Sequence, residues 1–166
     1  MILETKYSEK EIFDLLSQIP DPEIPVINIR ELGVLRSVKN ENGKVIVEMT
    51  PTYSGCPALD AIEDEIISKL HEHGIENAQV KKTLSPAWTT DWLTDEAKEK
   101  LRRFGIAPPE KSSADFNVLL GKKKSIACPH CGSENTEMIS MFGSTACKAL
   151  YRCNNCTEPF DYFKCI

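Results

Sequence analysis

The chain has 166 residues, of which 41% are hydrophobic, and 25 acidic against 20 basic side chains give it a formal net charge of -5. This acidic balance disfavours general binding to nucleic acids or to anionic membranes, because both require a basic surface. No apolar run approaches the ~20 residues that span a bilayer, and the first residues lack the pattern of a secretory signal. A cytoplasmic protein is therefore expected.

The cysteines are distributed unevenly, since six of the seven lie after residue 127. This distribution predicts two domains. We place the first at residues 1–109 and the second at residues 126–166, joined by a linker over residues 110–125 that contains few large apolar side chains. In a cytoplasmic protein, paired cysteines are more typical of metal or redox sites than of structural disulfides.

Helical and strand patterns alternate in the first domain. Residues 44–49 alternate apolar and polar side chains, as a half-buried strand does. Ser8 and Glu11 have the spacing of a capping box, and Thr94 and Gly105 have the character of the first and last caps of a short helix. The other expected elements are helices over residues 8–19 and 57–74 and strands over residues 34–39, 44–49 and 78–84. This order predicts an α+β fold, a small α-β-β-α-β sandwich with its helices on one face of the sheet.

Cys56 lies at the expected junction between a strand and a helix, in the run Thr-Pro-Thr-Tyr-Ser-Gly-Cys-Pro over residues 50–57. Free backbone N–H groups and the helix dipole at such a position lower the pKa of a thiol. The resulting thiolate binds metal or attacks electrophiles. Alternatively, Cys56 is a small buried residue that fills a tight joint between the two elements.

Asp21 and Glu23 lie in a loop that contains Pro22 and Pro25 and so cannot form regular structure. One interpretation is a pair of carboxylates held near a partner. The other is turn chemistry at Asp21 with a solvated Glu23, and the residues alone favour it.

Trp88 and Trp92 fall in an irregular stretch after the last strand of the first domain. Large aromatic rings in such a stretch either pack on the core or face a partner. Packing on the core is the favoured expectation.

Two C-x-x-C pairs mark the second domain, separated by 21 residues. Two such turns facing each other across a short sheet supply the four soft ligands of a tetrahedral ion, and Gly132 allows the sharp return of the first turn. We expect a zinc-ribbon-like domain with a structural zinc, because so small a core usually needs a metal. Two separate redox pairs are the alternative. The expected ligands are Cys128, Cys131, Cys153 and Cys156.

Cys147 and Cys165 are left outside this set. The spacing of Cys147, Cys153 and Cys156 comes within one residue of a plant-type ferredoxin pattern, so an iron-sulfur cluster held by these thiols and one other thiol is a competing hypothesis. It leaves Cys128 and Cys131 without a role, and we rank it below the zinc site. Simple buried thiols are the default for both remaining cysteines.

The chain resembles two related groups of proteins. Its first hundred residues are similar to small cytosolic iron-sulfur assembly factors of the SufT type. Nearly the whole chain resembles the PaaD (PaaJ) family of subunits of the phenylacetyl-CoA epoxidase system. The runs that carry the resemblance are residues 18–25, 50–57, 86–92, 143–153 and 159–166.

The resemblance implies an accessory role in aerobic phenylacetate degradation, with no catalysis by this chain. It implies that Cys56 is a cluster-handling thiolate beside Asp21 and Glu23, while the four paired cysteines hold zinc. Our hypothesis is a maturation factor that transiently holds an iron-sulfur cluster and passes it to the iron-sulfur flavin reductase of the oxygenase. A second Cys56 from a homodimer, or a ligand from the partner, would complete the site. The alternative is a docking subunit that contacts the oxygenase through Trp88, Trp92 and the zinc domain, without cluster chemistry.

Overall fold

The computed structural model describes residues 6–110 and 125–164, which form two compact units, Met1–Trp88 and Thr89–Ile166. The division falls earlier than the end of the first domain that we expected at residue 109. Residues 89–109 belong with the C-terminal unit because the short strand Ile106–Ala107 pairs with a strand near the end of the chain. The expected linker lies almost entirely outside the described residues.

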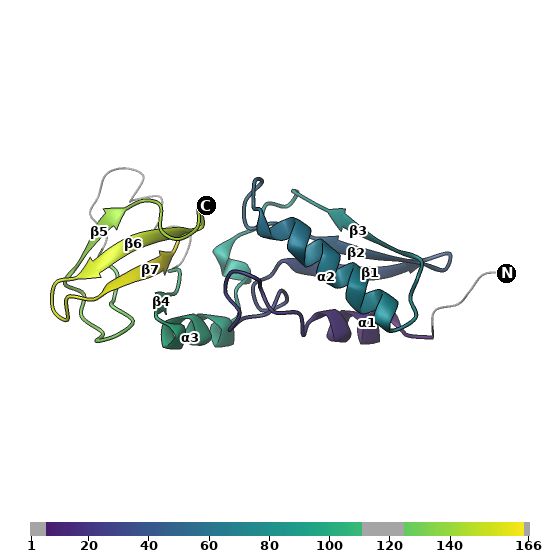
Figure 1. Ribbon diagram of the computed structural model, residues 1–166, viewed down its shortest axis with the longest axis horizontal. Coiled ribbons are helices and arrows are strands. Elements are labelled where there is room, and N and C mark those ends of the chain that lie inside the picture. The colour runs from purple at the N-terminus through teal and green to yellow at the C-terminus, as the bar shows by residue number, and fades with distance from the viewer. Residues whose placement is uncertain (1–5, 111–124, 165–166) are drawn as a thin grey trace. The chain divides into compact units, whose positions relative to one another are not determined.

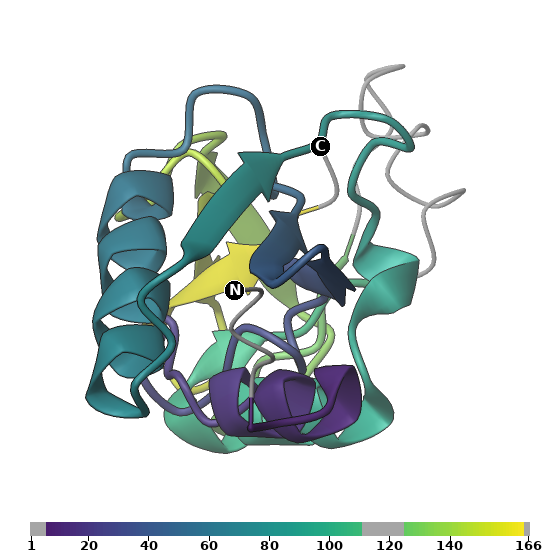
Figure 2. The ribbon, with the colours of Figure 1, turned by 90° about the vertical axis from the view of Figure 1, so that its right-hand side faces the viewer.

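The N-terminal unit has the predicted element order. It consists of α1 (Glu9–Leu16), β1 (Leu35–Glu41), β2 (Lys44–Met49), α2 (Ala58–Glu72) and β3 (Ala78–Lys82). The sheet order is β1-β2-β3, with β1 and β2 antiparallel and β2 and β3 parallel. Both helices lie on the same side of this sheet (Figures 1 and 2). The unit is thus the α+β sandwich expected from the sequence.

Local signals in the sequence account for these elements. The Ser8 Oγ accepts a hydrogen bond from the Glu11 backbone N–H at 3.2 Å, and the Glu11 carboxylate accepts one from the Ser8 N–H at 2.8 Å. This is the capping box that begins α1. On β2, Val45, Val47 and Met49 are fully buried and alternate with partly exposed residues. The apolar face of the central strand therefore forms the floor of the core.

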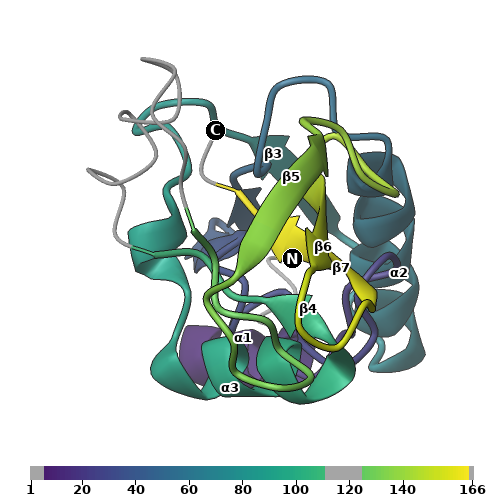
Figure 3. The ribbon, with the colours of Figure 1, turned by 90° about the vertical axis from the view of Figure 1, so that its left-hand side faces the viewer.

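The C-terminal unit contains a four-stranded sheet with the order β4-β7-β6-β5, in which β5 is an edge strand (Figure 3). Its elements are η1 (Thr90–Trp92), α3 (Asp95–Phe104), β4 (Ile106–Ala107), β5 (Thr136–Ser140), β6 (Lys148–Cys153) and β7 (Pro159–Phe163). Part of its core is a cluster of buried residues from the sheet and the adjoining loop. It comprises Ala107, Ile126, Cys128, Ala149, Tyr151, Cys153, Phe160 and Tyr162.

Trp88 is a core residue of the N-terminal unit. Only 5% of it is exposed, and its Nε1 donates a hydrogen bond to the Leu32 carbonyl oxygen at 2.9 Å. This confirms the favoured expectation for Trp88 and removes it from any docking surface, whereas Trp92 is half-buried. Within residues 6–110 and 125–164, no helix has the length and apolar character needed to cross a membrane.

Candidate metal-handling sites

Cys56 lies immediately before the N-cap of α2, Pro57, at the end of a turn in which the Cys56 N–H donates to the Tyr53 carbonyl oxygen at 3.2 Å. The two residues before it in this turn are exposed, and Cys56 itself is half-buried. The thiol is therefore reachable from solvent while one side of it packs against the protein. This is the strand-to-helix junction expected from the sequence.

The electrostatic environment of Cys56 is opposite to the one expected. Burial raises the pKa of the thiol, and the negative charges of Glu23 and Asp21 raise it further. A hydrogen bond from the Ala58 backbone N–H and one involving the Thr52 side chain lower the pKa, but by less than the opposing effects. The helix N-terminus thus acts as predicted, and burial and two carboxylates outweigh it.

Asp21 and Glu23 reach the neighbourhood of Cys56 from a loop about thirty residues earlier in the chain. Asp21 is 5% exposed, and its Oδ1 accepts hydrogen bonds from the N–H groups of Glu23 at 2.9 Å and Ile24 at 2.8 Å. Turn chemistry is therefore present at Asp21, as the residues alone favoured. Glu23 is half-buried rather than fully solvated. Sequence reasoning missed Thr52, although it belongs to the same run as Cys56.

Four cysteines of the C-terminal unit converge. The Sγ atoms of Cys128 and Cys156 are 3.7 Å apart, those of Cys131 and Cys153 are 3.6 Å apart, and all four lie within 4.8 Å of one another. The first pair lies on the loop before β5, where Gly132 adopts a φ of 76°. The second pair lies at the turn between β6 and β7.

The spacing of these thiols fits a single tetrahedral ion. With metal–sulfur bonds of about 2.3 Å, the sulfurs of a tetrahedral site stand roughly 3.8 Å apart. A four-iron cluster binds each cysteine to a different iron and needs a wider cage. The backbone N–H groups of Cys156 and Asn155 point to the Cys153 Sγ at 3.5 and 3.4 Å and lower its pKa to about 6. The structure therefore provides a preformed cage of four thiols whose spacing fits one metal ion.

Cys147 does not join this cage. It is buried, and its Sγ lies 3.0 Å from the Thr145 Oγ1. The ferredoxin-like set of Cys147, Cys153 and Cys156 is thus wrong, because the β6 strand separates Cys147 from the turn that carries the other two. Cys165 lies outside the described residues.

Comparisons with known proteins follow the same division. The family model of the PaaD zinc beta ribbon domain matches residues 112–164. A protein of Escherichia coli strain K12, named provisionally as a 1,2-phenylacetyl-CoA epoxidase subunit, is 51% identical over 94% of this chain and 92% of its own length. The chain belongs to the PaaD family.

The N-terminal unit links the PaaD family to iron-sulfur assembly proteins. The family model of the iron-sulfur cluster assembly protein matches residues 9–81. A protein of Porphyromonas gingivalis, named as an Fe-S protein maturation auxiliary factor, is 34% identical over 57% of this chain and 90% of its own length. The crystal structure of a domain of unknown function, DUF59, from Bacillus anthracis superposes with a TM-score of 0.52 and 26% identity, covering 56% of this chain and 90% of that domain.

Proposed function

We propose that this protein is a non-catalytic maturation subunit of a phenylacetyl-CoA epoxidase system. In this proposal Cys56 transiently binds an iron-sulfur cluster, which is the cargo of the protein, and delivers it to the iron-sulfur flavin reductase component. The four-cysteine cage of the C-terminal unit holds a structural zinc ion and takes no part in the transfer.

The observation that carries the proposal is the incomplete character of the Cys56 site. A single half-buried thiol with two carboxylates nearby cannot retain a cluster as four thiolates would. A second ligand must come from another Cys56 in a homodimer or from the receiving protein. Incomplete ligation favours release, and release is the property that a carrier needs. The names of the relatives that match the N-terminal unit support the same function.

The raised pKa of Cys56 also suits a carrier. Only the thiolate binds iron, so cluster binding must displace a proton from a thiol that holds it more firmly than usual. Return of that proton would help the cluster to leave. The Asp21 and Glu23 charges contribute to this effect, which gives the acidic loop a role in release rather than in binding.

The decisive experiment is anaerobic reconstitution of the wild type, Cys56→Ser and Ser54→Ala with iron and sulfide. Ser54 is exposed in the same turn and provides the matched control. We expect a sulfur-to-iron charge-transfer band in the wild type and in Ser54→Ala, no such band in Cys56→Ser, and about one zinc in all three.

Two outcomes would contradict the proposal. Equal iron binding by the wild type and Cys56→Ser would assign the cluster to other cysteines. Absence of iron from every variant, together with stable co-purification with the oxygenase, would favour a docking subunit. A complementary measurement is the cluster content of the reductase produced with either variant, which should fall with Cys56→Ser alone.

A further inference from the structure

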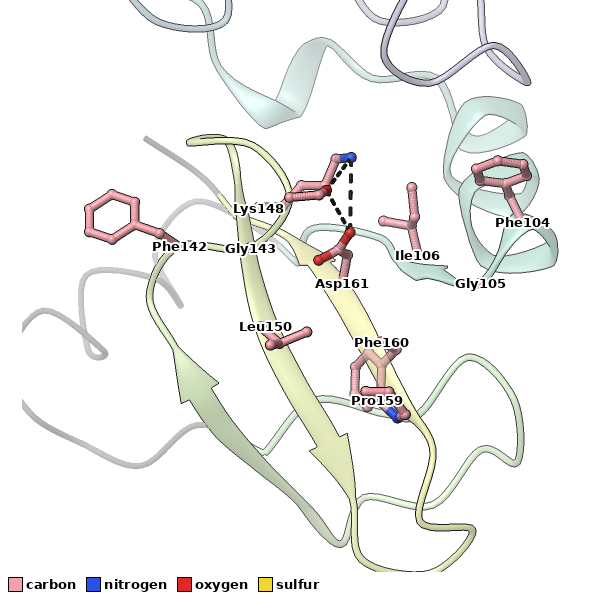
Figure 4. Close-up of a pocket in the computed structure, with 11 residues that line it drawn as sticks. Phe104, Gly105, Ile106, Phe142, Gly143, Lys148, Leu150, Pro159, Phe160 and Asp161 are labelled. Carbon is pink, nitrogen blue, oxygen red and sulfur yellow. Dashed lines mark hydrogen bonds and ion pairs between the residues drawn. The ribbon is translucent and has the colours of Figure 1, made fainter.

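The C-terminal unit contains a pocket of about 600 Å³ whose lining includes no cysteine (Figure 4). Its floor is the face of the sheet opposite the side that carries the buried Tyr151 and Tyr162. Ile106 of β4 and Leu150 of β6 both pair with Asp161 of β7, so these three side chains share that face. Phe104 and Phe142 stand on opposite sides of the floor in Figure 4. Neither the family models nor the named relatives assign a role to this pocket.

A polar cluster forms one wall of the pocket, in which Lys148 is buried, Asp161 is half-buried and Ser144 is exposed. The Lys148 side chain is only 6% exposed, and its Nζ donates a hydrogen bond to the Ser144 Oγ at 3.1 Å. The Ser144 hydroxyl in turn donates to the Asp161 Oδ2 at 2.9 Å. A side chain at Gly143 would place its Cβ 2.6 Å from the Asp161 Oδ1, so this close approach of the loop requires glycine. The cluster is therefore built into the fold.

Lys148 keeps hydrogen-bonding capacity that the protein does not use. Its ammonium group has three donors, and Ser144 accepts one of them. The Asp161 Oδ2 lies 4.0 Å from the Nζ, which is too far for a direct hydrogen bond. Among residues 6–110 and 125–164 no other side chain accepts from it. A ligand that enters the pocket with a hydrogen-bond acceptor can therefore accept from one of the remaining Lys148 donors.

The charge of the wall limits the kind of acceptor. Lys148 and Asp161 contribute one positive and one negative charge, so the wall itself has no net charge, and the Lys164 ammonium lies outside the wall, 4.4 Å from the centre of the Phe142 ring at the rim. An anionic ligand would gain the attraction of Lys148 but meet the repulsion of Asp161 a few ångströms away. A neutral carbonyl oxygen accepts from the ammonium without that penalty. The wall therefore favours an amide carbonyl over a carboxylate.

The rim of the pocket is apolar and exposed. Phe104 and Phe142 are 52% and 67% exposed, and Met141, next to Phe142, is 47% exposed. Exposed large apolar side chains at the edge of a cavity are typical of a protein interface, and aromatic rings favour an aromatic partner. We infer that this pocket binds a segment of a partner protein in which an aromatic side chain lies beside a neutral backbone carbonyl.

The test uses the full chain and three matched probes. N-acetyl-phenylalaninamide presents an aromatic ring with two backbone-type amides, 3-phenylpropanamide keeps the ring and one amide, and 3-phenylpropanoate replaces that amide by a carboxylate. Binding is followed by chemical-shift changes in ¹H-¹⁵N spectra. We expect shifts around the pocket with N-acetyl-phenylalaninamide, weaker binding of 3-phenylpropanamide, and the weakest binding of 3-phenylpropanoate.

Substitutions test which side chains of the pocket contribute to binding. Lys148→Met should weaken binding of N-acetyl-phenylalaninamide by about tenfold or more, because it removes a charged donor. Phe142→Ala should also weaken it, and this exposed position carries little risk to the fold. Lys81→Met, an exposed lysine of the N-terminal sheet, is the charge-matched control and should change nothing. The dispersed spectrum of each variant reports whether it is folded.

Four results would overturn the inference. Absence of any pocket shift with all three probes would mean that the pocket does not bind this chemistry. Unchanged affinity in both Lys148→Met and Phe142→Ala would place binding elsewhere. Tighter binding of the carboxylate would contradict the neutral acceptor, and binding of 3-phenylpropanamide as tight as that of N-acetyl-phenylalaninamide would indicate a free small amide rather than a protein segment.

Discussion

The two cysteine sites of this protein differ in completeness. The C-terminal unit gathers four thiols within 4.8 Å, and backbone N–H groups lower the pKa of one of them. The N-terminal unit offers a single thiol, Cys56, whose pKa is raised by burial and two carboxylates. The first arrangement favours permanent binding of one ion, and the second favours transient binding. Under the proposed function, the chain separates a metal that stabilises structure from a metal that is transferred.

The largest effect is expected from loss of the four-thiol cage. Cys128→Ser should abolish zinc binding and unfold the C-terminal unit, at a cost on the order of several kcal/mol, because so small a core depends on its metal. Zinc content and limited proteolysis would measure the effect. Cys147→Ser, a buried cysteine outside the cage, is the matched control and should retain its zinc. A Cys128→Ser variant that still binds a full complement of zinc would contradict the expected difference between the four-thiol cage and the Cys56 site.

Much of the fold could be predicted because its signals are local. Alternation along residues 44–49 identified β2, and the Ser8 and Glu11 pair located the start of α1. The two C-x-x-C pairs predicted a four-thiol group without knowledge of the intervening loop. In each case the deciding residues lie within a few positions of one another or form a repeated motif.

The failures of prediction involve contacts between distant parts of the chain. The pKa of Cys56 depends on Glu23 and Asp21, which periodicity cannot place beside it. The strand Ile106–Ala107 has only two residues, too few to show a period, and its partner β7 lies more than fifty residues later. The pocket around Lys148 could not be predicted for the same reason, because its walls come from α3, β4, β6, β7 and a loop, which are far apart in the sequence.

The second prediction concerns the acidic loop of the N-terminal site. Asp21→Ala should lower the free energy of unfolding by about 2 kcal/mol, because it leaves two N–H groups in a buried turn without their acceptor. Urea denaturation of the full chain would measure the loss. Glu23→Gln should have little effect on stability. Equal destabilisation by the two variants would show that both carboxylates stabilise the fold, which would contradict the expected difference between Asp21 and Glu23.

Substitutions at two glycines should have smaller effects on stability. Gly105 lies beside the four-thiol cage, and Gly55 lies beside Cys56. Gly105 has a φ of 93° and ends α3, and a Cβ there would lie 3.2 Å from the His130 Cε1 in the first metal-binding turn. Gly105→Ala should therefore destabilise the C-terminal unit by about 1 kcal/mol. At Gly55, next to Cys56, a Cβ would lie no nearer than 3.9 Å to a neighbour, so Gly55→Ala should be nearly neutral. Thermal unfolding of both variants would test the expected order.

The smallest expected effect concerns the reactivity of Cys56 itself. Alkylation by iodoacetamide requires the thiolate, so its rate at Cys56 should rise with pH and should still be rising at pH 9, where an ordinary thiol is already mostly ionised. Because the negative charge of Glu23 raises the pKa of the thiol, Glu23→Gln should lower that pKa and accelerate alkylation at pH 8, within about tenfold. Mass spectrometry of the peptide that contains Cys56 would separate it from the other cysteines.

The control for this measurement is Glu72→Gln, at the far end of α2 and roughly 20 Å along the helix from Cys56. Its charge is too distant to act strongly through solvent, so the alkylation rate should not change. Slower alkylation in Glu23→Gln would reverse the sign of the electrostatic argument. A rate plateau well below pH 8 in the wild type would mean that the helix N-terminus dominates after all. The Cys56 site would then resemble one thiolate of the C-terminal cage, and ready release of a bound cluster would need another cause.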